Sequence, residues 1–149
     1  LKEKYLTPAI DGEKIGCLCI SEPFGGSDVA GMKTTAVKKG DKYVINGSKT
    51  FITNGVYADF YVVAAKTAPE KGNKGMSMFL VDKEFKGISA TKLNKLGWRA
   101  SDTAELAFEV KICTWGLVVP LIPKFFALMA TVNKPNCNSY FDLSPSLSK

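Results

Sequence analysis

A glycine-rich stretch at residues 20–28, ISEPFGGSD, holds the side chains whose types and spacing best suit ligand binding. Its proline and two glycines allow turn geometries that bulkier residues resist, so the turn can present main-chain amides to a ligand. Ser21 and Ser27 add hydroxyl groups near its two ends. Such donors favour acceptor-rich partners, for example a heterocyclic carbonyl or a pyrophosphate. Taken alone, nine residues of this kind more often form an ordinary surface turn.

The composition is that of a folded globular protein. The 149 residues are 46% hydrophobic and 23% charged, which is enough to build one domain around one core. The net charge of +6 comes mostly from lysine, because Arg99 is the only arginine. Proteins that read bases or clamp phosphates rely on arginine, so nucleic-acid binding is not expected.

The cysteines argue against a metal site. The chain has four of them, contains no histidine and has no C-x-x-C pair, so a zinc site is not expected. Cys17 and Cys19 lie two residues apart in a predicted strand and should share one face as small buried thiols. Cysteines that serve as buried thiols fit a protein of a reducing compartment. No N-terminal signal sequence is visible in the residues given.

Alternating apolar and polar residues predict short β-strands along most of the chain. The first covers residues 15–20, and residues 59–66, apolar on both faces, are expected to form the central strand. Ala104, Leu106 and Phe108 should face inward from a strand at residues 103–108. Further extended segments are expected at residues 76–81 and from Gly87 through residues 93–96.

Three other strands are expected to form a meander of two hairpins: residues 33–37, 42–46 and 49–53. Asn46 and Gly47 form a typical two-residue hairpin turn, here between the second and third of these strands. Within the third, the two-residue period places Phe51 and Thr53 on one face.

These segments predict an all-β fold, a closed antiparallel barrel or orthogonal sandwich of seven or eight short strands. No convincing amphipathic helix precedes residue 110.

The two ends of the chain differ from this strand pattern. Residues 1–12 are expected to be a lead-in that ends in a turn. Residues 115–132 are apolar but interrupted by two prolines and a lysine, and residues 133–149 are polar. A membrane span needs about 20 apolar residues, so an irregular or partly helical tail is expected instead.

Four motifs in order, SEPFGGSDVAGMKT, NGSKTFITNG, GMSMFLVD and LGWRASDTAELAFE, resemble the middle β domain of the acyl-CoA dehydrogenase family. The resemblance covers about residues 6–109. It implies that residues 1–110 form this domain and that residues 111–149 are an atypical tail. It also implies a flavoenzyme that binds FAD and an acyl-CoA thioester and carries out α,β-dehydrogenation.

The resemblance assigns cofactor contacts to five positions: Ile20, Ser21, Ser27, Phe51 and Thr53. The first two match residues that contact the flavin ring, Phe51 matches an aromatic that packs on it, and Thr53 matches a hydrogen-bond donor near its N5 atom. Ser27 matches a serine close to both the FAD pyrophosphate and the pantetheine of the substrate. Thr67 matches a hydroxyl position that touches the CoA arm.

The family's catalytic carboxylate lies in a helical domain after the β domain, so the resemblance implies no catalytic residue here and an inactive isolated chain. Glu22 and Asp28, the carboxylates of the glycine-rich stretch, are interpreted as structural. The implied partners are an acyl-CoA substrate and electron-transfer flavoprotein, with a homo-oligomer at full length. The implied location is intracellular, in the mitochondrial matrix in a eukaryote or the cytoplasm in a bacterium.

Two alternative functions stay open at this stage. The chain could be a non-catalytic β-barrel module that binds a protein or an acyl-CoA, which the atypical tail would suit. It could also belong to an acyl-CoA oxidase, in which oxygen reaches the reduced flavin.

Overall fold

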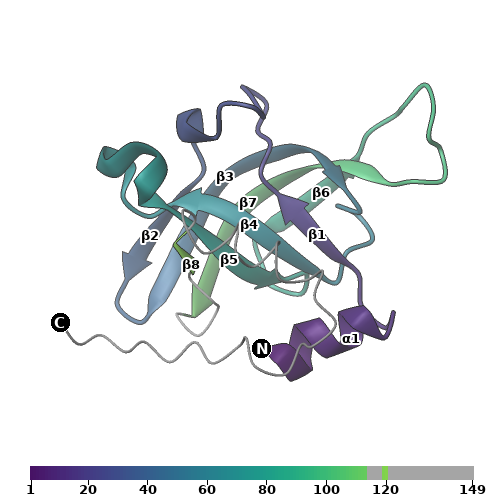
Figure 1. The fold of residues 1–149 in the computed structure, drawn as a ribbon, viewed down its shortest axis with the longest axis horizontal. Coiled ribbons are helices and arrows are strands. Elements are labelled where there is room, and N and C mark those ends of the chain that lie inside the picture. The colour runs from purple at the N-terminus through teal and green to yellow at the C-terminus, as the bar shows by residue number, and fades with distance from the viewer. Residues whose placement is uncertain (114–118, 121–149) are drawn as a thin grey trace, which may run out of the picture.

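The structure, a computed structural model, describes residues 1–113 and 119–120 (Figure 1). Two short helical segments begin the chain, and most of the remaining described residues lie in β-strands or the turns between them. The strands are β1 (Gly16–Cys19), β2 (Thr35–Lys39), β3 (Lys42–Thr53), β4 (Phe60–Lys66), β5 (Met76–Asp82), β6 (Ile88–Lys92), β7 (Thr103–Cys113) and β8 (Val119–Pro120). The helical segments are η1 (Lys2–Leu6), α1 (Thr7–Ile10), η2 (Val29–Gly31) and η3 (Pro69–Gly75).

The strands form one mixed sheet, so the predicted all-β fold is confirmed. The sheet curls into a half-barrel rather than the predicted closed barrel or orthogonal sandwich, because its strand order leaves β6 and β8 as ends that do not pair with each other among the described residues. Their order is β6-β7-β3-β2-β4-β5-β8, and β1 pairs with β4 outside this path. The expectation of antiparallel pairing throughout was wrong, because β4 pairs in parallel with β1 and, at Lys66, with β2. Parallel pairing needs a long connection, and the forty residues between β1 and β4, which contain β2 and β3, supply one.

The central strand β4 is covered on both faces, as its apolar sequence predicts. Tyr61, Val63 and Ala65 point into the main core, where the ring centroid of Tyr61 lies 5.9 Å from that of Phe108. The opposite face packs in a smaller cluster, in which Ala64 meets side chains from β5 and from the segment around η2. The glycine-rich loop, residues 20–28, is thereby connected to the sheet through an apolar contact.

The inward side of β7 also follows the predicted alternation. Ala104, Leu106 and Phe108 are buried, and the same period continues through Val110 and Ile112. Cys17 and Cys19 share one buried face of β1 as free thiols, with 3.6 Å between their sulfur atoms. Both patterns show strands whose buried faces can be derived from the sequence alone.

The predicted turn at Asn46 and Gly47 was wrong. β3 runs without interruption through both residues, because the long strand β7 pairs with it along most of its length. Gly47 has a φ of +151°, and a Cβ at this position would lie 2.7 Å from the Cα of Thr34. The glycine therefore allows a close backbone approach rather than a turn.

Two other expectations also need correction. The lead-in ends in a turn at Asp11 and Gly12, as predicted, but the residues before that turn form η1 and α1. Tyr5 is buried there, with its ring centroid 5.2 Å from that of Phe60. The strand after Gly87 ends at Lys92, so residues 93–96 belong to the loop that projects at the upper right of Figure 1.

Most of the tail that was expected to be irregular or partly helical lies outside the described residues. Of this tail, the structure describes residues 111–113, which end β7, and residues 119–120, which form the short strand β8 and pair with β5. In the part of the chain that the structure describes, no helix is long and apolar enough to cross a membrane.

Candidate functional site

A β-bulge in β3 determines which way the candidate ligand-binding residues face. The register with β7 shifts between Lys49 and Ile52, and the consecutive residues Lys49 and Thr50 are both buried. The bulge breaks the alternation, so that Ile52 enters the core while Phe51 and Thr53 on either side of it are exposed. Phe51 and Thr53 thus share the solvent side of the strand, as the two-residue period predicts.

Phe51 is an unusual residue even for a bulge. Its φ is +57°, a left-handed conformation that side chains other than glycine rarely adopt, and 72% of its surface is exposed. A large apolar side chain at a strained, solvent-facing position gains nothing from the fold. Strain of this kind is concentrated at functional sites, so the ring is a strong candidate for ligand contact.

The glycine-rich loop lies directly beside this bulge. The backbone N–H of Thr50 donates to the carbonyl oxygen of Ser21 over 2.9 Å, which joins the loop to β3 next to Phe51. The Ser21 side chain is half-buried and faces Gly26, where a Cβ would lie 3.0 Å from its Oγ. Ser21, Phe51 and Thr53 therefore come from two segments that meet.

Three hydroxyl groups of the candidate site are free to bind a ligand. Within residues 1–113 and 119–120, the side chains of Ser21, Ser27 and Thr53 make no hydrogen bond to protein. Ser27 is exposed on the loop just before η2. Ile20 is half-buried and packs in the smaller apolar cluster beneath the loop.

Glu22 holds the loop in shape, as its structural interpretation predicts. Its carboxylate accepts hydrogen bonds from the backbone N–H groups of Lys33 (2.6 Å) and Thr34 (3.0 Å), from the Thr34 hydroxyl and from Lys49 Nζ (2.9 Å). Burial alone would raise the pKa of Glu22, but these donors outweigh it and lower the pKa below its ordinary value. Glu22 is therefore an ionised anchor and not a free base.

Asp28 is also structural. Its Oδ1 accepts a hydrogen bond of 3.0 Å from the backbone N–H of Gly31, which caps η2. A Cβ on Gly31 would lie within contact of the same carboxylate, so the glycine makes room for the cap.

Thr67 lies at the end of β4, and its hydroxyl is already engaged. The Thr67 Oγ1 donates to the carbonyl oxygen of Gly75 over 3.1 Å and lies 3.0 Å from the hydroxyl oxygen of Ser77. It retains lone pairs that can accept a hydrogen bond. Because η2 contacts η3, which comes just after Thr67, this residue is at the same end of the sheet as the glycine-rich loop.

Sequence reasoning missed two buried charged residues near the site. Lys49 is fully buried, although a lysine at the start of a strand normally suggests a surface position. Asp102 accepts a hydrogen bond of 2.6 Å from the backbone N–H of Val56 and so fixes the turn after Thr53. Its other carboxylate oxygen is buried without a partner among the described residues. Lys49 keeps the inward alternation of β3, and no sequence signal announces that this position is buried or that a bulge follows it.

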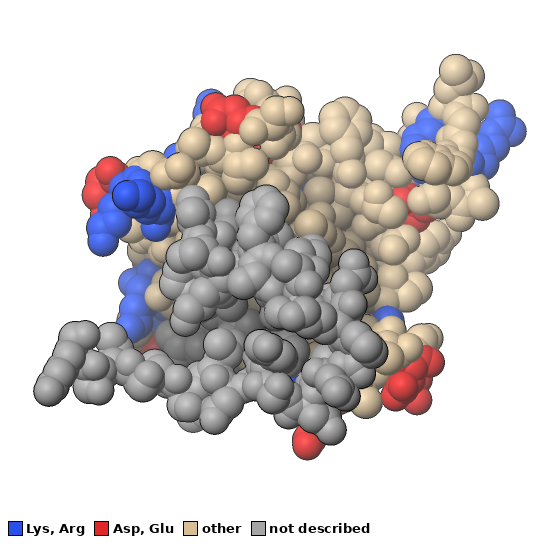
Figure 2. Space-filling view, viewed as in Figure 1, with Lys and Arg blue, Asp and Glu red and all other residues tan. Residues whose placement is uncertain are grey.

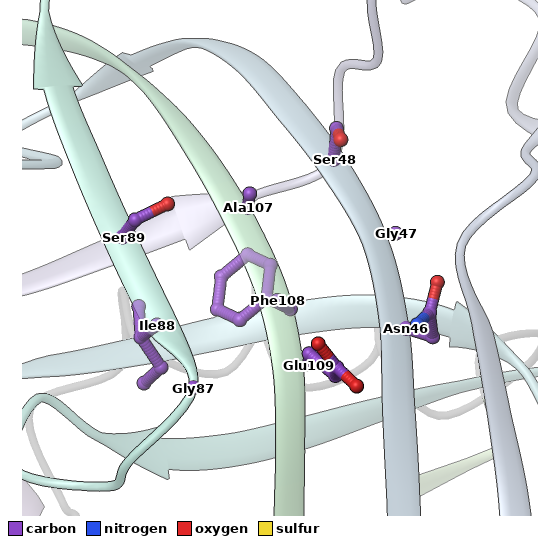
Figure 3. Close-up of a pocket in the computed structure, with 9 residues that line it drawn as sticks. All are labelled: Asn46, Gly47, Ser48, Gly87, Ile88, Ser89, Ala107, Phe108 and Glu109. Atoms are coloured by element: carbon purple, nitrogen blue, oxygen red, sulfur yellow. The ribbon is translucent and has the colours of Figure 1, made fainter.

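Two hollows of the described surface lie beside the candidate residues rather than at them. A shallow hollow of about 440 Å³ crosses β3, β7 and β6, where Ser48, Ala107 and Ser89 are neighbours in register (Figure 3). A second hollow, of about 210 Å³, is lined by Pro23 and Glu105 among others. None of the predicted site residues lines either hollow, so a ligand at Phe51 would rest on an open surface of this domain.

In the part of Figure 2 that is not drawn in grey, basic residues form separate groups. Lysine and arginine side chains gather near the left edge and around the projecting loop at the upper right (Figure 2). This distribution suits general solvation or long-range attraction of an anion better than a phosphate-binding surface.

The fold and the site define a β-sheet domain that offers a flat aromatic surface and several free hydroxyl groups to a ligand. The family model described as "Acyl-CoA dehydrogenase, middle domain" matches residues 17–110, so the chain belongs to the acyl-CoA dehydrogenase family. The resemblance found in the motifs is confirmed.

Individual relatives agree with this membership. The chain is 54% identical over 109 residues to "Acyl-CoA dehydrogenase, short-chain specific" of Clostridium acetobutylicum, and the match covers 72% of this chain and 29% of that protein. The chain thus spans less than a third of that relative's length.

Solved structures share the fold. A structure described as an FAD-dependent dehydrogenase has a TM-score of 0.78 and 37% identity, over 85% of this chain and 35% of that one. Another, described as "Electron transferring flavoprotein of Acidaminococcus fermentans", has a TM-score of 0.76 and 43% identity, over 78% and 31%.

Proposed function

We propose that this chain is the domain that holds FAD and an acyl-CoA thioester in an enzyme that dehydrogenates the α,β bond of the acyl group. The exposed, conformationally strained Phe51, with Thr53 beside it and Ser21 joined to the neighbouring Thr50, carries this proposal. An exposed aromatic ring next to unpaired hydroxyl groups fits a flat heterocycle that needs both stacking and hydrogen bonds. The residues present therefore fit a flavin.

Each site residue has a role that its position supports. Phe51 would pack on the ring system of bound FAD, and the Thr53 hydroxyl would donate a hydrogen bond to that ring, as the family resemblance implies. Ile20 and Ser21 contact the polar edge of the ring through the main chain and the Ser21 hydroxyl. When bound, FAD supplies the acceptor for the hydride that leaves the β-carbon.

The substrate is held at the loop end of the sheet. We propose that the exposed, free hydroxyl of Ser27 binds both the FAD pyrophosphate and the pantetheine arm of the acyl-CoA, as the family resemblance implies. Thr67 contributes an acceptor oxygen to the CoA arm from the end of β4. Both residues belong to the same end of the sheet because η2 contacts η3.

The base that removes the α-proton does not come from this domain. Glu22 is buried among four hydrogen-bond donors, and Asp28 caps η2, so neither carboxylate of the loop is available for proton transfer. We propose that residues 1–110 provide only the cofactor and substrate contacts, and that the 149-residue chain is inactive alone.

The proposal extends to the setting in which this domain works. The whole enzyme would form a homo-oligomer and pass electrons to electron-transfer flavoprotein. The buried free thiols Cys17 and Cys19 support an intracellular location, which would be the mitochondrial matrix in a eukaryote or the cytoplasm in a bacterium.

Titration of the 149-residue chain with FAD tests the proposal. We expect measurable binding that Thr53→Ala weakens, because the variant loses a hydrogen bond to the ring. The control is Thr91→Ala, which removes an exposed threonine from β6, a strand that does not pair with β3. Equal affinities for the two variants would contradict the role of Thr53.

Two further outcomes would overturn the proposal. Turnover of an acyl-CoA with a dye acceptor at enzyme-like rates would show that the chain contains its own base. Binding of a CoA thioester without any affinity for FAD would instead identify a non-catalytic binding module.

A further inference from the structure

Lys49 is the most completely enclosed charged residue of the described chain. None of its surface is exposed, and its Nζ donates to the carbonyl oxygen of Ile20 over 3.1 Å and to Glu22 Oε1 over 2.9 Å. Removing an ammonium group from water costs several kcal/mol, and an apolar pair of similar volume is often at least as stable as a buried ion pair. Stability is therefore a poor reason for a lysine here.

Lys49 connects the two segments of the candidate site, the glycine-rich loop and the Phe51–Thr53 segment of β3. Its ammonium group binds Ile20 and Glu22, which flank Ser21 in the glycine-rich loop. Its backbone begins the bulge that turns Phe51 outward two residues later. One side chain thus spans from the loop to the strand across the interior of the site.

Other contacts reinforce the same junction. The Thr50 N–H donates to the Ser21 carbonyl oxygen, and Glu22 is anchored to the backbone of Lys33 and Thr34, just before β2. Lysine suits this position because a compact cation on a long stem can reach both a carbonyl and a carboxylate. Without its ammonium group, the Ile20 carbonyl would lose its donor and Glu22 its counter-charge.

We propose that Lys49 is a positioning residue that sets the separation between the glycine-rich loop and the Phe51–Thr53 segment, so that both contact one flat ligand. The identity of that ligand rests on the proposed function, whereas the junction itself can be tested without it. Lys49 does not touch the ligand in this proposal, because it lies beneath the surface that Phe51 and Ser21 present.

The test uses the full chain with the double substitution Lys49→Met and Glu22→Gln. Methionine keeps the length of the stem, and glutamine leaves no buried charge unpaired. The glutamine oxygen can still accept hydrogen bonds from Thr34, whereas its amide nitrogen cannot accept the one that Lys33 N–H donates to Glu22. Lys42→Met is the matched control, because it removes an exposed lysine from the same strand. Thermal unfolding first establishes that the double variant folds.

Hydrogen exchange of individual amides provides the deciding measurement. The amides of Thr50 and Glu22 donate hydrogen bonds that join the strand to the loop and close the loop turn, respectively. We expect both to exchange about tenfold faster or more in the double variant, while amides of the β4–β5 ladder keep their rates. Unchanged exchange at Thr50 and Glu22 in a folded double variant would overturn the proposal, as would uniform acceleration along all strands.

The bound flavin gives a second readout. At saturating FAD, the visible absorption spectrum of the double variant should shift toward that of free FAD, and the dissociation constant should rise about tenfold or more. A wild-type spectrum and affinity would overturn the positioning role. If the wild-type chain binds no FAD, the proposed function fails for this chain, and the exchange result still decides whether Lys49 forms the junction.

Discussion

Replacing Phe51 by glycine should cost this domain less stability than replacing it by alanine, which reverses the usual order for a strand. The reason is the backbone: Phe51 has a φ of +57°, which glycine adopts freely and alanine does not. The side chain itself is 72% exposed, so its removal deletes little core packing.

The magnitude comes from two opposing effects. A left-handed conformation costs a residue other than glycine about 1–2 kcal/mol. Glycine in a strand is otherwise less favourable than alanine by about 0.5–1 kcal/mol, because it loses more backbone freedom on folding. Phe51→Gly should therefore be more stable than Phe51→Ala by about 0.8 kcal/mol, the difference between the midpoints of the two ranges.

Urea unfolding of the two variants measures this difference, and Val37 provides the matched control. Val37 is exposed on β2 and has no positive φ, so there the alanine variant should be the more stable of the pair. The reasoning is refuted if alanine is also favoured at position 51. It is equally refuted if either Phe51 variant loses about 3–5 kcal/mol, the usual cost of removing a buried phenylalanine.

The same two variants separate stability from ligand binding. Both lack the aromatic ring, so FAD should bind to each about fivefold to tenfold more weakly than to the wild type. A variant that is close to the wild type in stability but weaker in binding would show that the strain at position 51 serves the ligand.

Three further predictions concern the fold and its ionisable groups. Gly87→Ala should destabilise the domain by about 2 kcal/mol or more in urea unfolding. The reason is that Gly87 has a φ of +94° and that a Cβ there would lie 2.0 Å from the carbonyl oxygen of Glu109. An unchanged urea midpoint would contradict this prediction. The lowered pKa of Glu22 means that its ionised form stabilises the fold above its ordinary value of 4.5 and that this contribution disappears as the pH falls below it. The stability difference between wild type and Glu22→Gln should thus shrink in acid, and a constant difference would argue against it. Burial raises the pKa of Tyr61 to about 12 from 10.0, so stability should fall as the pH rises from 10 toward 12, and Tyr61→Phe should lose less over that range in denaturant titrations.

Much of the fold could be predicted from local patterns. Strands such as β4 and β7 depend on which faces are apolar, and that information is present in the order of residues. The family resemblance depends on several motifs in a fixed order, so it also required no coordinates. The assignments of Ser21, Ser27 and Thr53 come from those motifs, and the structure adds that their hydroxyl groups make no hydrogen bond within the described residues.

Other features depend on contacts between distant segments. Asn46 and Gly47 have the sequence of a hairpin turn, yet they remain in β3 because β7 offers a continuous partner. The parallel pairing of β1 with β4 results from how the chain crosses between them, which a strand pattern does not encode.

The candidate site shows most clearly which features the sequence determines and which depend on the tertiary structure. The sequence alone determined that an aromatic residue and a threonine stand two apart on a strand, after a loop with one proline, two glycines and two serines. Only the tertiary structure decided that Lys49 is buried against Ile20 and Glu22 and that a bulge turns Phe51 outward. The physical reason is that a bulge arises from the fit between two strands that are far apart in the chain, and no local period predicts it.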